Sequence, residues 1–226
     1  MYDKRYYQSL RSHSYGSATK IIGYLTSFLD VSTVIDFGCG MGTWCLAARE
    51  LGINKIIGID QNPYNSEYML ISSDQYLQKD LRNTIDLDMS ACIVISVEVV
   101  EHIEEEYGEI FVENLCRHSD IILFSAAIPH QGGEGHVNEK PCSYWSKIFA
   151  SKGYCYIDCI RPAFWDDNDV AVWYKNNCIL YVKDSVYPSI YPKVSICPPI
   201  DIVHPSMVED KFKKWNVISN LLQRKT

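Results

Sequence analysis

The sequence predicts an α/β fold built on a doubly wound, mostly parallel sheet of seven strands. Three observations support this: short apolar segments alternate with amphipathic ones, a glycine-rich turn follows the first, and an aspartate ends the second. Alternating strands and helices favour parallel pairing with helices on both faces of the sheet. Ligands of such sheets bind at the carboxyl ends of the strands, where we expect the functional site.

The predicted strands are short and rich in apolar or β-branched residues. They are 32–37, 55–60, 75–79, 91–97, 121–126, 154–160 and 178–182. The continuous apolar run 91–97 is typical of a strand that is buried on both faces. Apolar residues at helical spacing predict helices over 4–11, 15–29, 99–118 and 143–152, and another helix opening at Thr43.

The glycine-rich turn lies within Val34–Trp44, where Gly38, Gly40 and Gly42 alternate with larger residues. Glycine adopts backbone angles that other residues avoid, and it has no Cβ to hold a ligand away. The turn therefore predicts a cradle for a small molecule. Its G-x-G-x-G spacing differs from the G-x-G-x-x-G of dinucleotide sites, which argues against a nicotinamide cofactor.

An acidic residue ends the second predicted strand. Asp60 lies 24 residues after Asp36, the acid at the end of the first strand. In a strand–helix–strand unit, an acid at this distance sits at the carboxyl end of the neighbouring strand. Its two oxygens can accept hydrogen bonds from both hydroxyls of a ribose. The pattern predicts a ligand that contains a nucleoside.

Four motifs, in this order, resemble those of the class I S-adenosylmethionine-dependent methyltransferases. They are Asp36–Trp44, Gly58–Asp60, Lys79–Leu81 and Ser96–His102. The resemblance implies the Rossmann-like methyltransferase fold, with S-adenosyl-L-methionine as cofactor and S-adenosyl-L-homocysteine as product. It further implies that the glycine turn seats the methionine part, Asp60 the ribose and Asp80 the adenine.

The resemblance also implies which residues contact the cofactor. We expect cofactor-binding roles for Asp36, Gly38, Cys39, Gly40, Gly42, Thr43, Trp44, Asp60, Gln61, Asp80, Leu81, Ser96 and Val97. The predicted organisation has three parts. N-terminal helices in 1–30 cover the cofactor site, residues 31–183 form the methyltransferase domain, and residues 184–226 form an extended arm and a final helix.

A further segment resembles a subgroup of small bacterial and phage methyltransferase-domain proteins. It comprises Ala126–Glu139, Tyr144-Trp145 and Arg161–Trp165. Members are often associated with O-methylation of sugars or natural products, so the resemblance implies a small hydroxylated acceptor. The aromatic residues could stack on such an acceptor, although packing roles explain them equally well. Arg161, placed at a strand end, could bind an anionic group or form an internal ion pair.

Methyl transfer to oxygen needs a group that takes the proton of the nucleophile. The candidates are His136, which lies in a glycine-rich loop after the fifth-strand segment, then His130, and Glu98 beside the transferring methyl. An imidazole titrates near neutral pH and suits this role. Each histidine could instead be a loop residue that makes a structural hydrogen bond. His102 recurs in family members with differing substrates, which favours a structural role.

A metal-assisted alternative rests on Glu98, Glu101 and His102, to which His136 could add a fourth ligand. This set resembles the metal site of small-RNA 3′-terminal 2′-O-methyltransferases, where a metal lowers the pKa of the nucleophile. The same string occurs in relatives that use no metal, so we assign none. The alternative functions are thus a metal-assisted RNA 2′-O-methyltransferase and a non-catalytic methyltransferase-like binding module.

Composition argues against a nucleic-acid partner. The net charge is −7, no Lys/Arg-rich run occurs, and the predicted helix 99–118 carries six glutamates. The chain shows neither a signal peptide nor an apolar run long enough to span a membrane, so we expect a cytoplasmic protein. Its nine cysteines are dispersed without a C-x-x-C pair and are expected to be small buried residues.

The C-terminal part changes character at Asp184. Five prolines punctuate 184–205, which predicts an extended, irregular arm. Apolar residues at helical spacing predict a final helix over 206–224, which either packs on the domain or forms a homodimer contact.

Overall fold

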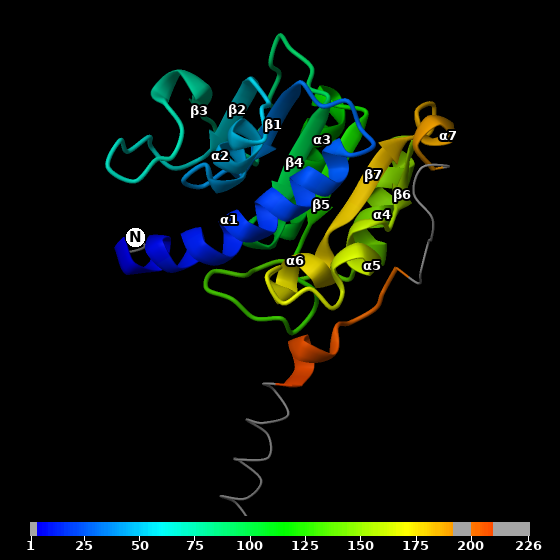
Figure 1. The fold of residues 1–226 in the computed structure, drawn as a ribbon. Helices are drawn as coiled ribbons and strands as arrows, with labels where there is room; N and C mark the ends of the chain where they lie inside the picture. Colours follow the sequence, from blue (N-terminus) through cyan, green and yellow to red (C-terminus); the bar gives the residue numbers. More distant parts are fainter. Residues whose placement is uncertain (1–3, 192–199, 210–226) are drawn as a thin grey trace, which may run out of the picture.

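The computed structural model describes residues 4–191 and 200–209, with side chains described from Ser14 onward. Its seven strands form one sheet in the order β3-β2-β1-β4-β5-β7-β6 (Figure 1). All pairs are parallel except those of β7, which runs antiparallel to both β5 and β6. The strands are β1 Thr33–Phe37, β2 Lys55–Asp60, β3 Tyr76–Gln78, β4 Ile93–Val97, β5 Ile121–Ser125, β6 Tyr154–Ile157 and β7 Ile179–Lys183. The predicted fold class is confirmed.

Helices cover both faces of the sheet. The α-helices are α1 Lys4–Thr26, α2 Thr43–Glu50, α3 Gly108–His118, α4 Cys142–Ser151, α5 Ile160–Phe164, α6 Val172–Asn177 and α7 Tyr187–Ile190. Short 3₁₀ turns occur at η1 Ser73–Gln75, η2 Val100–His102 and η3 Glu105–Tyr107. One apolar cluster lies under α1, α2, α5 and α6, and a second lies under α3 and α4. These two cores hold the helices against the sheet.

The register brings the carboxyl ends of the central strands to one edge. Asp36 of β1 pairs with Gly58 of β2 on one side and with Ile95 of β4 on the other. Parallel pairing in this register places the chain that leaves β1, β2 and β4 on the same side of the sheet. The glycine turn, Asp60 and Glu98 therefore lie at a common edge, as the sequence predicts.

The N-terminal prediction of two helices is wrong, because α1 is one continuous helix from Lys4 to Thr26. The interval between the two predicted segments contains serine and histidine, which a helix tolerates at modest cost. The predicted apolar face is confirmed, since Ile21, Ile22 and Leu25 are buried in the core.

The predicted helix 99–118 is also corrected. Its first part forms η2 and η3, and the regular helix α3 begins only at Gly108. Glu98 has a left-handed backbone, with φ of 54°, and Ile103 is extended. This interrupted path of the chain places the side chains of Val100 and Ile103 in the core under α3. A regular helix that starts at residue 99 need not bury both of them.

Two further predictions near the C-terminus need correction. The strand predicted over 154–160 ends at Ile157, and Arg161 lies in α5, where it forms an ion pair with Asp158. An internal ion pair was one of the two roles predicted for Arg161. The arm 184–205 is not wholly irregular, because it contains α7. Residues 205–209 are helical, and the rest of the predicted helix 206–224 lies outside the described residues.

Two predicted properties can be compared with the structure directly. Eight of the nine cysteines lie in the described part of the chain, and five of these eight are buried. Among the described residues, every helix is too short or too polar to cross a bilayer.

Candidate active site

The glycine turn after β1 is shaped by close packing. Gly38, Gly40 and Gly42 all have positive φ angles, of 79°, 55° and 85°, a region that disfavours residues with a Cβ. A Cβ at Gly38 would lie 2.4 Å from the side chain of Val99, so the turn lies directly against the chain that leaves β4. At Gly40 a Cβ would meet no atom within 4 Å, so the turn is open to a ligand there.

Asp60 is joined to this turn. Its Oδ2 accepts a hydrogen bond from the backbone N–H of Gly40 at 2.9 Å. Its Oδ1 accepts from the backbone N–H and the side-chain amide of Asn62, at 3.0 and 2.9 Å. A carboxylate oxygen has room for a further donor, so Asp60 can still receive a ribose hydroxyl. Asn62 was not among the predicted residues. An aspartate side chain commonly accepts a hydrogen bond from the backbone N–H two residues later, which is the turn seen here.

Asp36 lies behind the turn. Burial of its carboxyl group raises the pKa of Asp36 to about 7, the thiol of Cys45 opposes this by donating a hydrogen bond, and the charge of Asp60 adds to it. The side chain is 2% exposed. Asp36 can therefore influence the cradle through its charge state, while its carboxyl group has little open surface for a ligand.

The remaining predicted cofactor residues fall into two groups. The first group is Asp80, Leu81 and Gln61. The Asp80 carboxylate accepts hydrogen bonds from Nε and Nη2 of Arg82, Leu81 is buried, and the side chain of Gln61 is exposed. Near the turn, the buried residues are Cys39, Thr43, Trp44, Ser96 and Val97. Ser96 is fully buried and its hydroxyl has no partner, so as placed it offers no surface to the cofactor.

Glu98 follows β4 and is held by several donors. Ser125 Oγ and Asn177 Nδ2 donate to Oε1 at 2.8 and 3.0 Å, and Gln131 Nε2 donates to Oε2 at 2.9 Å. Burial raises the pKa of the Glu98 carboxyl, and these donors oppose the rise. Gln131 and Asn177 were not predicted, because amides from a loop and a distant helix carry no recognisable spacing.

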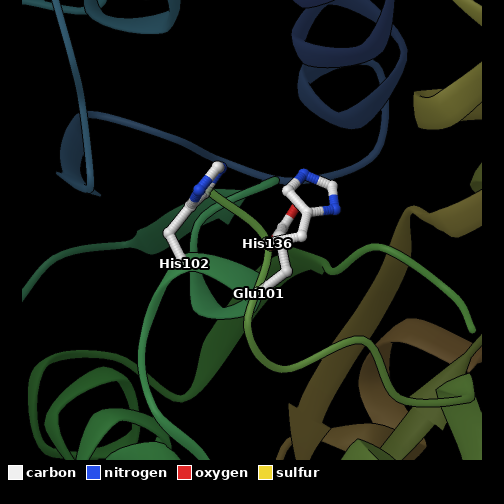
Figure 2. A group of neighbouring side chains, drawn as sticks. All are labelled: Glu101, His102 and His136. Atoms are coloured by element: carbon white, nitrogen blue, oxygen red, sulfur yellow. The ribbon is translucent and has the colours of Figure 1, made fainter. Parts of the chain in front are cut away.

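Three side chains beside Glu98 form a compact cluster, shown in Figure 2. One potential ligand atom from each of Glu101, His102 and His136 lies within 4.8 Å of the others. The rings of the two histidines meet edge to face, with centroids 4.8 Å apart. Glu101 and His102 come from η2, and His136 comes from the loop after β5. The structure thus unites three of the four residues proposed for a metal.

The carboxyl group of Glu101 is the unusual member of this cluster. It is fully buried, and among the described residues neither oxygen makes a hydrogen bond of ordinary geometry, although the Glu98 carboxyl group lies against it. Burial, then the charge of Glu98, raises the pKa of Glu101 well above its usual range. Burial, then the charge of His136, lowers the pKa of His102. A buried carboxyl group without a partner is costly, and a cation bound between the three groups would supply one.

The loop that carries His136 is tied together by Glu139. Its carboxylate accepts from the backbone N–H of His130 and of Gly132 and lies 2.9 Å from His136 Nδ1. Burial raises the pKa of the Glu139 carboxyl group, but these three interactions together outweigh it, so the pKa is lowered. His130 has a left-handed backbone and an exposed side chain. The structure therefore brings His136 into the cluster and leaves the His130 ring at the surface.

A family model described as a methyltransferase domain matches residues 9–119, which hold the glycine turn, Asp60 and the Glu101–His102 pair. Just under half of the chain is thus similar to a methyltransferase domain.

The fold is similar to those of solved methyltransferase structures. Magnesium protoporphyrin IX methyltransferase from Synechocystis PCC 6803, with bound SAH, has a TM-score of 0.55 and 16% identity over 81% of this chain and 89% of that chain. A methyltransferase in calicheamicin biosynthesis, in its SAH-bound form, has a TM-score of 0.54 and 15% identity over 79% of this chain and 56% of that chain. At such identities the similarity concerns the fold.

Curated relatives match over a shorter region. Ribosomal protein L11 methyltransferase of Vibrio vulnificus is 43% identical over 61 residues, which is 26% of this chain and 20% of that protein. The chain thus spans about a fifth of the length of the curated relatives it matches.

Proposed function

We propose that the methyltransferase domain transfers a methyl group from S-adenosyl-L-methionine to a hydroxyl group of a small acceptor, such as a sugar or another natural product. The observation that carries this proposal is that Glu98 lies near His136, whose ring contacts that of His102. These groups can accept a proton, and Glu98 directly precedes Val99, whose side chain packs against Gly38 of the glycine turn. The net charge of −7 disfavours a polyanionic acceptor.

The donor side of the site fits the cofactor. The open space at Gly40 and the spare acceptor capacity of Asp60 provide a seat for the methionine and ribose parts. When bound, the cofactor supplies an activated methyl group on sulfur. The protein must then hold the acceptor oxygen in line with that methyl group, and positioning of this kind supplies a large part of the rate.

The acceptor side must remove a proton. Glu139 lies against Nδ1 of His136 and orients the ring, which leaves Nε2 as the nitrogen able to take a proton. Nε2 lies over Gly133, where a Cβ would come within 2.2 Å of it. Glycine at this position is therefore a condition for the placement of His136. Glu98 is the second candidate, since burial raises its pKa toward neutrality.

A second candidate function is metal-assisted O-methylation, including the RNA 2′-O-methylation considered above. The observation that favours it is the buried carboxyl group of Glu101, which lacks a hydrogen bond of ordinary geometry among the described residues and lies beside His102 and His136. These three residues would hold the cation, which would lower the pKa of a bound hydroxyl. RNA is disfavoured as acceptor by the acidic surface of α3 and η3, which carry Glu105, Glu106, Glu109 and Glu113.

Two measurements test the proposal. Calorimetry with S-adenosyl-L-homocysteine should show binding, and its absence would remove the cofactor assignment. Methyl transfer should then be followed with labelled S-adenosyl-L-methionine against a panel of sugars, phenolic natural products and short RNAs. Label transferred to a small hydroxyl compound supports the first candidate, and label on RNA supports the second. Binding without transfer to any class would instead favour the non-catalytic binding module.

Metal dependence is separated by one further experiment. Activity after dialysis against a chelator should be unchanged for the metal-free mechanism. Activity lost to the chelator and restored by a divalent cation would select the metal-assisted mechanism.

A further inference from the structure

Glu98 belongs to a closed ring of three side chains. Asn177 Nδ2 donates to Glu98 Oε1 and also to Gln131 Oε1, at 3.0 and 2.9 Å. Gln131 Nε2 closes the ring by donating to Glu98 Oε2 at 2.9 Å. Asn177 is 1% exposed, so the ring is shielded from water on that side. A buried network of this kind holds its members in one arrangement when every bond is made.

The direction of the Gln131 amide is fixed by the backbone. Its Oε1 accepts a second hydrogen bond, from the backbone N–H of Ile128 at 3.2 Å. A backbone N–H can only donate, so the atom that faces Ile128 must be the oxygen. The nitrogen of Gln131 therefore has to face Glu98.

The direction of the Asn177 amide is fixed by the C-terminal segment. The backbone N–H of His204 donates to Asn176 Oδ1 at 2.6 Å, so the nitrogen of Asn176 points the other way and donates to Asn177 Oδ1. That bond in turn directs the nitrogen of Asn177 toward Glu98. A relay of donors thus runs from His204 to Glu98.

The start of this relay is firmly anchored. Within the segment Ile200–His204, the carbonyl of Ile200 accepts from Arg161 Nη1 at 2.8 Å, and Asp201 accepts from the backbone N–H of Ser143 at 2.9 Å. The His204 ring bonds the carbonyl of Trp165 at 2.8 Å. Arg161 is fully buried, so its contact with Ile200 is shielded from competition by water.

We propose that Asn177 and Gln131 are positioning residues for Glu98, and that the segment Ile200–His204 sets their orientation through Asn176. The proposal deepens the proposed function and rests on it only in assigning Glu98 to the acceptor side. A carboxylate offers about four lone-pair positions. Ser125, Asn177 and Gln131 occupy three of them, and the fourth faces the Glu101 carboxyl group and the space for an acceptor hydroxyl.

The relay can be tested without any methyl acceptor. In proton–nitrogen correlation spectra of the full chain, the side-chain NH₂ signals of Gln131 and Asn177 are identified by their loss in Gln131→Glu and Asn177→Asp. His204→Pro removes the N–H that starts the relay and should shift both signals by more than a linewidth. His204→Ala keeps this N–H but removes the ring contact with Trp165, so it should shift both signals less than His204→Pro does.

A second variant tests the relay without changing the backbone of the segment Ile200–His204, which a proline could displace as a whole. Asn176→Asp keeps the oxygen that faces His204 but replaces the donor to Asn177 with an acceptor, so it should also shift both signals. The relay is refuted if neither His204→Pro nor Asn176→Asp moves them, or if His204→Ala moves them as far as His204→Pro.

The positioning role is tested by kinetics with the acceptor found in the panel. Asn177→Asp and Gln131→Glu each replace a donor to Glu98 with a second acid, and each should lower kcat by about tenfold or more. The Kd for S-adenosyl-L-homocysteine should change by less than about twofold. If both variants keep their kcat while the wild type methylates, the positioning role is wrong and the proposed function stands.

Asn114→Asp is the matched control. Asn114 is another buried amide, which accepts from the backbone of Ile85 and donates to that of Asn83. It has no link to Glu98 among the described contacts. This variant should lower the Tm but retain kcat, and a loss of kcat equal to that of Asn177→Asp would attribute both losses to general destabilisation.

Discussion

The donor side of the site is built from neighbouring residues and the acceptor side from distant ones. On the donor side, the backbone N–H groups of Gly38 and Cys39 donate to the carbonyl of Ile59, and Gly40 binds Asp60. These contacts join the ends of two adjacent parallel strands. One strand–helix–strand unit therefore creates the cradle largely through its backbone.

The acceptor side has no such local unit. The donors that hold Glu98 come from Ser125, Gln131 and Asn177, which lie 27, 33 and 79 residues away in the sequence. All three act through side chains, so a single substitution can remove a bond. The comparison teaches that the donor side should resist substitutions that spare its backbone, while the acceptor side should respond to changes far from the chemistry.

The largest effect is expected on the acceptor side. His136→Ala should lower methyl transfer by roughly 100-fold to 10,000-fold, the range for loss of a proton-transfer group, and should leave S-adenosyl-L-homocysteine binding unchanged. Gly133→Ala should give a comparable loss, because its Cβ would displace the His136 ring. Initial rates and calorimetry on the same preparations measure both quantities.

The same loop provides the comparisons for this prediction. His130→Ala should cost less than about threefold, since its ring is exposed. Glu134→Ala, at another exposed position, should leave the rate of methyl transfer unchanged. Equal losses for His130→Ala and His136→Ala would show that the loop as a whole matters, and the His136 ring would then have no separate role.

The difference between the two sides also explains what the sequence could predict. The seven strands, the glycine turn and Asp60 follow from local patterns, and the structure has each of them near its expected place. Glu101 and His102 were recognisable as neighbours in the sequence. Whether His136 lies beside them depends on how the loop after β5 folds back.

Other features left no readable signal. The late start of α3 depends on the left-handed backbone of Glu98, and glutamate carries no local preference for that conformation. Asn62, Gln131 and Asn177 are ordinary amides whose importance lies in their partners. Ser96 was expected to face the cofactor, yet the structure buries it completely. Side-chain networks across long sequence separations are the part that local patterns do not encode.

The next effect should fall on the donor side and act through folding. Gly38→Ala would place a Cβ 2.4 Å from Val99 at a positive φ. Overpacking and the left-handed backbone together should lower the free energy of unfolding by about 3 kcal/mol. Gly40→Ala is the matched substitution, because its φ is also positive but its Cβ would meet open space. It should cost about 1 kcal/mol. Denaturant unfolding of the two variants decides this, and equal losses would contradict the packing argument.

A third effect concerns affinity on the donor side. Asp60→Ala should weaken S-adenosyl-L-homocysteine binding by roughly 100-fold, because hydrogen bonds to a charged group contribute about 1.5–3 kcal/mol. Asn62→Ala removes only a support of Asp60 and should weaken binding by less than about tenfold. Calorimetry of both variants ranks them. An unchanged Kd for Asp60→Ala would remove Asp60 from the cofactor site.

The smallest expected effect is a pH dependence at the base of the cradle. Burial raises the pKa of Asp36 to about 7 from an ordinary value of 3.8. The folded chain therefore binds one proton more than the unfolded chain between these values, and stability falls as pH rises through this window. Asp36→Asn remains neutral at every pH. Its advantage in stability over the wild type should therefore grow by about 2 kcal/mol between pH 5 and pH 8.

Thermal unfolding of Asp36→Asn and wild type at pH 5 and pH 8 measures this difference, with Asp88→Asn as the exposed control. A gain for Asp36→Asn that is equal at both pH values would show that the substitution improves packing without relieving a buried charge. A gain that grows from pH 5 to pH 8 would mean that the donor side, although built from backbone, contains one charge state that the solvent can change. In that case the two sides of the site would share a dependence on buried carboxyl groups, Asp36 beneath the glycine turn and Glu98 beside it.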